Sequence, residues 1–178
     1  MVKLDRLLVI DIEATCWKKS PPPEQENEII EVGIATIDLT TKIIEEKVSI
    51  LVKPQCSTVS TFCTDLTTLT QDRVDAGVSF ADACLRLRKE YLSEKRVWAS
   101  YGDYDRRMFE KQCKARGIRY PFGVRHLNVK TLFAIARGLP REVGMARALE
   151  MLDLPLEGTH HRGHDDAWNI AKILLKLI

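Results

Sequence analysis

The segment Leu7-Leu8-Val9-Ile10-Asp11-Ile12-Glu13 decides how the rest of the chain is read. Its continuous apolar run is typical of a central strand that is buried on both faces. Because residues i and i+2 of a strand point to the same side, Asp11 and Glu13 project together from its end, while Ile12 faces the opposite layer. Two adjacent carboxylates repel each other beside an apolar strand unless they share a cation. The pattern therefore indicates either a metal site or a strand that ends in solvated acids.

The segments that follow predict an α/β fold in which a mixed sheet is flanked by helices. Two β-rich runs after a polar, Pro-rich loop are typical of an antiparallel hairpin, and two shorter runs are candidates for a fourth and a fifth strand. The expected strands are 7–10, 29–37, 43–52, 96–100 and 127–129. The apolar spacing predicts helices at 80–91, 105–116, 131–136 and 145–152, and a Thr-rich loop precedes the first of them.

The last helix is the clearest, and acids lie at its start. Its apolar residues form one stripe at helical spacing: Ala167, Ile170, Ala171, Leu174 and Leu177. We expect Asp165 to cap this helix and Asp166 to lie near its positive end. His161 lies on the preceding loop, and its ordinary pKa near 6.5 suits a general base. The same residues are also typical of a metal-free helix cap, and we expect His160 and His164 to be exposed or to contact a phosphate.

A third group of polar residues, Tyr101-Gly102-Asp103-Tyr104-Asp105, lies where a predicted strand meets a predicted helix. Such junctions are where α/β folds collect ligands. Asp105 is a candidate third metal ligand, whereas Asp103 is more typical of a helix cap.

The composition indicates one ordinary globular domain rather than a disordered or fibrous chain. The chain has 178 residues, of which 45% are hydrophobic and 29% charged, and its formal net charge is +2. No apolar run has the length of a signal-peptide core or a membrane span, so we expect a cytoplasmic protein. The five cysteines are odd in number and lack a C-x-x-C pair, which fits neither a disulfide framework nor a zinc site.

Residues 86–119 are locally basic, with eleven Lys and Arg against five Asp and Glu, a net charge of +6. This stretch is either a surface for a polyanion or a solvated helix face, because only a spatial patch attracts phosphates.

Taken together, the order D-x-E, then Y-D, then H-x-x-x-x-D resembles the DEDDh branch of the DnaQ-like 3′-to-5′ exonucleases, whose core is RNase H-like. The flanking residues resemble the Eri and histone-mRNA 3′-exonuclease relatives, including the bacterial KapD-like proteins. The segments that carry this resemblance are 11–16, 28–31, 62–67, 69–71, 160–163 and 165–166. The match runs from about Leu7 to the C-terminus and implies a mixed five-stranded sheet.

By position, the resemblance implies four metal carboxylates and a general base, namely Asp11, Glu13, Asp105, Asp166 and His161. It also implies two divalent ions, Mg²⁺ or Mn²⁺, with Asp11 bridging them and Glu13 contacting the terminal 3′-hydroxyl. The second motif departs from the family because it lacks the usual Asn and has Tyr104 where relatives have Phe or Trp. Asp103 therefore stays open as the alternative ligand to Asp105.

The expected partner is the 3′ end of a single-stranded nucleic acid, RNA rather than DNA, with nucleoside 5′-monophosphates as products. The candidate substrate contacts are Glu13, Ala14, Thr15, Trp17, Tyr104, Arg106 and His161. Aromatic side chains would stack on unpaired bases, and arginines would contact phosphates; Trp17 could equally cover the core.

Two alternatives remain at the level of sequence. One is a DNA exonuclease, because the catalytic motifs do not distinguish the sugar, and the other is a catalytically silent nucleic-acid-binding module. We expect residues 1–178 to form a single exonuclease domain without the appended RNA-binding domain of larger relatives.

Overall fold

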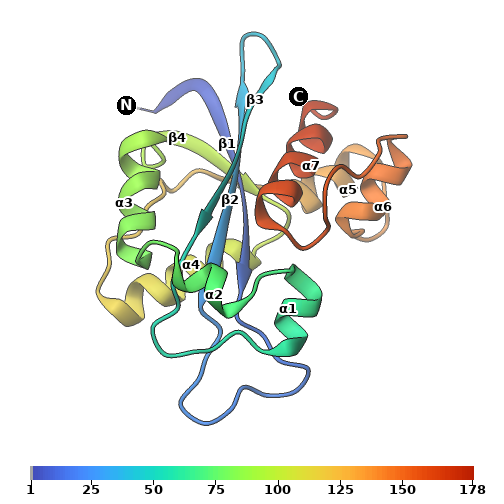
Figure 1. The fold of residues 1–178 in the computed structure, drawn as a ribbon. Helices are drawn as coiled ribbons and strands as arrows, with labels where there is room; N and C mark the ends of the chain where they lie inside the picture. Colours follow the sequence, from blue (N-terminus) through green and yellow to red (C-terminus); the bar gives the residue numbers. More distant parts are fainter. Residues whose placement is uncertain (1) are drawn as a thin grey trace.

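The computed structural model describes residues 2–178 and shows a five-stranded sheet with helices on both faces (Figure 1). The strands are β1 (Lys3–Ala14), β2 (Ile29–Asp38), β3 (Ile44–Leu51), β4 (Arg96–Ser100) and β5 (His126–Asn128). Their spatial order is β3-β2-β1-β4-β5, with β1 antiparallel to β2 and parallel to β4. The predicted mixed sheet and the predicted hairpin are confirmed.

Seven helices complete the described part of the chain. They are α1 (Thr61–Thr67), α2 (Gln71–Asp75), α3 (Phe80–Glu90), α4 (Tyr104–Arg116), α5 (Val129–Ala136), α6 (Met145–Met151) and α7 (Gly163–Leu175). Two of them, α1 and α2, lie where the sequence predicted a Thr-rich loop, so that prediction was wrong. Both are too short to show an apolar period, and α1 is instead held by its cap, where the Ser60 hydroxyl accepts the N–H of Cys63.

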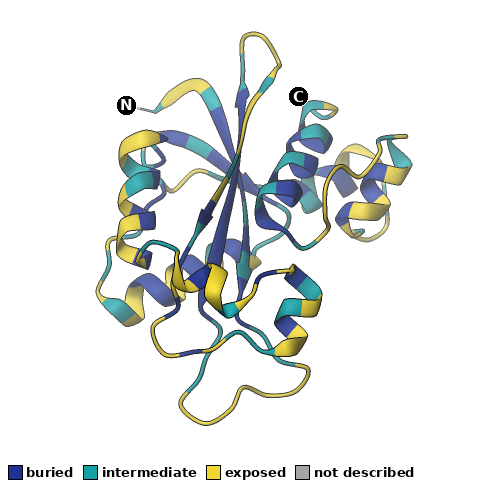
Figure 2. Ribbon diagram, viewed as in Figure 1, coloured by how far each residue is buried: buried dark blue, intermediate teal, exposed yellow. Residues whose placement is uncertain are grey.

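The central strand divides the core into two layers (Figure 2). Leu8, Ile10 and Ile12 pack into the layer that contains residues of α3 and α4. Leu7 and Val9 pack into the layer that contains α7. Because side chains alternate along a strand, the odd-numbered acids that follow continue toward the α7 side of the sheet.

A contact between two glycines places α7 on the sheet. A Cβ atom added to Gly33 of β2 would lie 1.9 Å from the carbonyl carbon of Gly163, so only glycine allows this approach. The helix begins at Gly163 with Arg162 as its N-cap, and the predicted cap, Asp165, was wrong. Asp165 lies in the first turn, where its carboxylate accepts the N–H of Thr159 and pairs with Lys47 instead. The close packing brings the first turn of α7 to the end of β1.

Helix α4 reaches the same end of the sheet from the other layer. Asp103 occupies its N-cap position, as expected, but its side chain makes no capping hydrogen bond. Met108, Phe109 and Cys113 bury the helix against the sheet, and Gly117 ends it with a φ of 61°. The residues of its first turn therefore lie beside the end of β1.

All five cysteines are free thiols, and Cys63, Cys84 and Cys113 are buried. Within residues 2–178, we find no helix with the length and apolar character needed to cross a membrane.

Candidate active site

The residues predicted to carry chemistry meet in one pocket of about 300 Å³. The pocket lies where β1 ends and where α4 and α7 begin. It is lined by Asp11, Ile12, Glu13, Tyr101, Tyr104, Asp105, Met145, His160, His161 and Asp166. We call it the acid pocket.

Three of the four acids form a tight group. Carboxylate oxygens of Asp11, Glu13 and Asp166 lie within 4.8 Å of one another. Asp105 lines the same pocket outside this group, and its Oδ1 accepts the backbone N–H of Ile12 at 2.9 Å. This hydrogen bond joins the first turn of α4 directly to β1.

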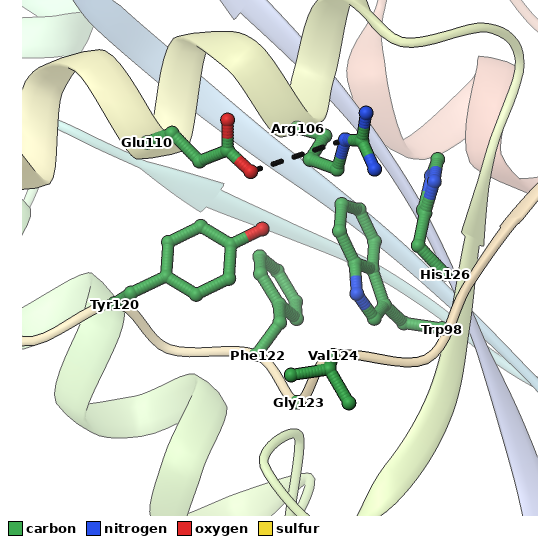
Figure 3. A pocket seen from close by; sticks show the side chains of 8 residues that line it. All are labelled: Trp98, Arg106, Glu110, Tyr120, Phe122, Gly123, Val124 and His126. Carbon is green, nitrogen blue, oxygen red and sulfur yellow. Dashed lines mark ion pairs between the residues drawn. The ribbon is translucent and has the colours of Figure 1, made fainter.

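The structure distinguishes the two aspartates of the second motif. Asp105 is 4% exposed and lines the acid pocket. Asp103 lies outside it and forms an ion pair with Arg106 at 3.5 Å. Arg106, which was expected near the substrate, lines a different pocket next to His126 (Figure 3).

The acids repel one another in a poorly solvated site, and their pKa values show it. Burial, and then the negative charges of Asp105 and Glu13, hold the pKa of Asp11 well above its ordinary value. Burial together with Asp166 raises the pKa of Glu13 to about 9. Burial also raises the pKa of Asp105 to about 6, although the hydrogen bond from Ile12 opposes the shift. Such a cluster is stabilised when a cation replaces the missing positive charge.

The donor set fits a hard divalent cation. Carboxylate oxygens from three separate elements converge, no cysteine lines the acid pocket, and its two histidines, His160 and His161, lie close enough to Asp166 to form a second group of possible ligands. Oxygen ligands of this kind suit Mg²⁺ and Mn²⁺, whereas zinc favours cysteine and histidine.

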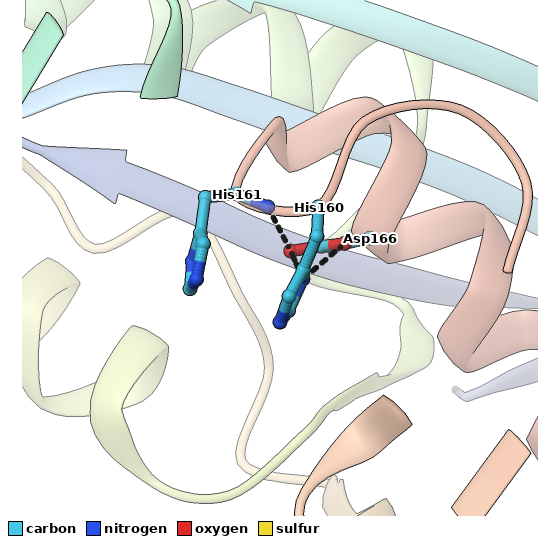
Figure 4. Close-up of side chains that lie close together, drawn as sticks. All are labelled: His160, His161 and Asp166. Atoms are coloured by element: carbon cyan, nitrogen blue, oxygen red, sulfur yellow. Dashed lines mark hydrogen bonds and ion pairs between the residues drawn. The ribbon is translucent and has the colours of Figure 1, made fainter. Parts of the chain in front are cut away.

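Two histidines stand at the rim of the acid pocket with their rings stacked 4.0 Å apart (Figure 4). The backbone N–H of His161 donates to Oδ2 of Asp166 at 3.0 Å, and His161 adopts a left-handed φ of 65°. Burial, and then the neighbouring His160, lower the pKa of His161, so the neutral imidazole is favoured. A neutral ring can accept a proton, as a general base must.

His160 is exposed, as expected, but its contact with Asp166 was not predicted. Its Nδ1 lies 3.0 Å from Oδ2 of Asp166 (Figure 4). The only available signal was the presence of a second histidine beside the expected base, and that alone does not fix a side-chain direction.

A buried carboxylate holds the loop that carries these histidines. Glu31 of β2 accepts hydrogen bonds from Nε and Nη2 of Arg162, both at 3.1 Å, and from the N–H of Gly163 at 3.0 Å. Burial alone would raise the pKa of Glu31, but the hydrogen bonds from Arg162 and Ser49 outweigh it and lower the pKa. His164, expected to be exposed or at a phosphate, is half-buried with its Nδ1 3.0 Å from Glu31. Glu31 and Arg162 belonged to the segments that carried the resemblance, but spacing alone did not pair them.

The remaining candidate substrate contacts are placed differently. Tyr104 is 54% exposed and lines the acid pocket. Ala14 and Thr15 are buried, and the Thr15 hydroxyl bonds the backbone of Glu26 and Glu28, which turns it away from the acid pocket. Trp17 is half-buried and does not line this pocket. Tyr101, whose hydroxyl donates to the carbonyl of Val143 at 3.0 Å, and Met145 complete its wall.

Comparison with known proteins gives a consistent result. The family described as exonuclease (RNase T) matches residues 8–174. The human protein named 3'-5' exoribonuclease 1 is 31% identical over 98% of this chain, and the match covers 52% of the human protein. The Drosophila melanogaster 3'-5' exonuclease Snipper is 28% identical over 97% of this chain and 69% of its own length. The chain thus spans about half the length of the human relative it matches.

Solved structures agree with this comparison. The nuclease domain of 3'hExo, described as a DEDDh family member bound to rAMP, superposes with a TM-score of 0.88 at 30% identity. The alignment covers 97% of this chain and 90% of that one. Cell-death related nuclease 4 superposes with a TM-score of 0.81 at 26% identity, over 97% of this chain and 63% of that chain. Together, the family match, the DEDDh relative and the shared fold show that the chain belongs to the exonuclease family, in its DEDDh branch.

Proposed function

We propose that the protein is a 3′-to-5′ exonuclease that uses two divalent metal ions to shorten single-stranded nucleic acid, RNA in preference to DNA. The observation that carries this proposal is the convergence of Asp11, Glu13, Asp105 and Asp166 on one pocket with His161 at its rim. The ions are Mg²⁺ or Mn²⁺, and the products are nucleoside 5′-monophosphates.

Each side chain has a distinct task in this reaction. Two cations bound at the carboxylates would activate the attacking water and stabilise the departing 3′ oxygen. Asp11, Glu13 and Asp166 offer the oxygens that hold the charge in place, and Asp105 is oriented for the same task by its bond to Ile12. His161 takes the proton of the attacking water, a step worth about 10² to 10⁴ in rate. The carboxylate of Glu13 would also contact the terminal 3′-hydroxyl, and this contact would select a strand end.

The preference for RNA rests on the relatives. The human relative is named an exoribonuclease, and a third solved structure, with a TM-score of 0.84, is described as 3'-end specific recognition of the histone mRNA stem-loop by 3'-exonuclease. These names concern those proteins, and they favour RNA as the substrate class here. We also propose that residues 1–178 form one exonuclease domain. A cytoplasmic location stays a prediction.

The test uses 5′-labelled single-stranded RNA and DNA of the same sequence. We expect a ladder that shortens from the 3′ end with Mg²⁺ or Mn²⁺, no product with EDTA, and faster cleavage of RNA. A strand blocked by a 3′-phosphate serves as the control for end recognition and should resist. Equal cleavage of the blocked strand, or cleavage with EDTA, would contradict the proposal, and faster cleavage of DNA would assign the DNA alternative.

A further inference from the structure

Consecutive residues of α4 line two different pockets. Asp105 faces the acid pocket, while Arg106 lines a second pocket of about 340 Å³ (Figure 3). This volume falls within the range of roughly 300 to 1,000 Å³ that is usual for ligand sites. The second pocket is lined chiefly by Trp98, Arg106, Glu110, Tyr120, Phe122 and His126. We call it the aromatic pocket, and no residue that lines it also lines the acid pocket.

The aromatic side of this pocket is already ordered. Trp98 of β4 is fully buried, and its ring lies at a centroid distance of 4.2 Å from both Phe122, on which it stacks, and His126. Tyr120 meets Phe122 edge-on at 5.7 Å. His126 is fixed by a contact of 2.8 Å between its Nε2 and the hydroxyl of Ser100. A preformed pocket of this kind needs little ordering when a ligand binds.

Two buried donors at this pocket have no hydrogen-bond partner among residues 2–178. They are Nε1 of Trp98 and Nε of Arg106. Figure 3 shows the indole nitrogen of Trp98 turned toward Phe122 and Val124, inside the group of lining side chains. A buried donor without a partner costs free energy, and a ligand that brings acceptor atoms would relieve this cost only after the side chains around the donors shift, because neither donor atom is open to solvent.

An acceptor lies one helical turn from Arg106. The Oε1 of Glu110 is 3.9 Å from Nε of Arg106, which is longer than a hydrogen bond, and the Glu110 side chain is 55% exposed. A guanidinium donor and a carboxylate acceptor thus stand side by side above aromatic rings. Guanine matches both, because its O6 and N7 accept hydrogen bonds and its N1–H and N2 amino group donate them. Adenine would turn an amino donor toward the arginine.

We propose that the aromatic pocket binds a guanine base of the single strand, a few nucleotides upstream of the 3′ end that enters the acid pocket. This proposal rests on the exonuclease function proposed above. The neighbouring positions of Asp105 and Arg106 on α4, the exposed Val124 and the half-buried ring of Tyr120 in the same pocket support it. The protein would then bind a strand more tightly when a guanosine lies at one defined distance from the 3′ end.

The experiment separates guanine binding from hydrolysis. Binding is measured by fluorescence anisotropy in EDTA, where no cleavage occurs, with labelled oligouridylates that carry one guanosine at successive positions from the 3′ end. We expect one position to tighten binding about tenfold, which corresponds to about 1.4 kcal/mol. An adenosine at that position should not. Cleavage of the same strands is measured separately with Mg²⁺.

A matched pair of variants assigns the effect to this pocket. Glu110→Ala removes the proposed acceptor, whereas Glu90→Ala removes a similarly exposed glutamate that pairs with Arg86 at the same i,i+4 spacing on α3. We expect E110A to lose the guanosine effect and E90A to keep it. The proposal is overturned if no position favours guanosine or if both variants behave alike. It is also overturned if E110A weakens the binding of free guanosine 5′-monophosphate but does not change the binding of guanosine-containing strands. Guanosine-dependent binding without cleavage would reject the exonuclease function and leave the base site standing.

Discussion

The Nδ1 atom of His160 lies 3.0 Å from Oδ2 of Asp166, the same oxygen that accepts the backbone N–H of His161 at 3.0 Å. One carboxylate oxygen is thus held by two successive residues of the loop before α7. In the proposed reaction, His160 would orient a metal ligand, and His161 would accept a proton from water.

Removal of each histidine should therefore have a different effect. Hydrogen bonds that orient a ligand are typically worth about 10- to 100-fold in metal affinity. We expect His160→Ala to weaken Mn²⁺ binding by about tenfold in calorimetry. His161→Ala should lower kcat by about 10² or more with little change in substrate affinity. Equal metal affinities in the wild type and H160A would contradict the orienting role.

The burial of Asp11, together with the repulsion among the acids, predicts that one substitution stabilises the metal-free protein. The pKa of Asp11 is raised, so its ionised form is disfavoured in the folded state and costs stability at every pH above its unfolded value. Asp11→Asn should raise the melting temperature in EDTA at pH 7 and abolish hydrolysis. Added Mg²⁺ should stabilise the wild type more than D11N. A lower melting temperature for D11N than for the wild type in EDTA would show that burial and repulsion of the Asp11 carboxylate do not destabilise the fold.

The acids of the acid pocket could be assigned from the sequence because the order of three motifs resembles the DEDDh exonucleases, whereas each motif alone left another interpretation open. Asp11 follows the apolar run of β1, Asp105 lies in the first turn of a helix that follows a strand, and Asp166 lies in the first turn of the last amphipathic helix. The contacts of Glu31 and Arg162 could not be found in this way, because they join residues 131 positions apart. The short helix α1 was missed because it has no apolar period that the sequence could show. A cap at Ser60 marks its start instead.

Loss of Arg162 should destabilise the protein strongly, because both partners of the pair of Glu31 and Arg162 are buried. Arg162→Met leaves an uncompensated carboxylate inside the protein, and a broken buried pair typically costs about 3 to 5 kcal/mol. The matched control is Arg6→Met, which breaks the pair with Glu45 at the surface and should cost less than about 1 kcal/mol. Urea unfolding of both variants measures the difference. Similar losses of unfolding free energy in the two variants would mean that the buried pair is worth no more to stability than the surface pair.

Glu28 should make the stability of the protein depend on pH in acid solution. It is fully buried and accepts the backbone N–H groups of Gln55, Cys56 and Ser57, besides its pair with Arg116. Burial alone would raise the pKa of Glu28, but the hydrogen bond from Gln55 and the contact with Arg116 outweigh it, so the pKa lies below the ordinary 4.5.

A carboxyl group with a lowered pKa in the folded state stabilises that state fully above its unfolded pKa, and this stabilisation is lost as the pH falls through the folded value. Glu28→Gln removes the titration but keeps the size of the side chain. The difference in unfolding free energy between wild type and E28Q should therefore be constant above about pH 5 and should shrink below pH 4.5. Urea unfolding at a series of pH values measures it. If the difference in unfolding free energy between wild type and E28Q stays constant down to pH 3, protonation of Glu28 costs the folded state no stability. The loop after β3 then does not hold Glu28 as a carboxylate.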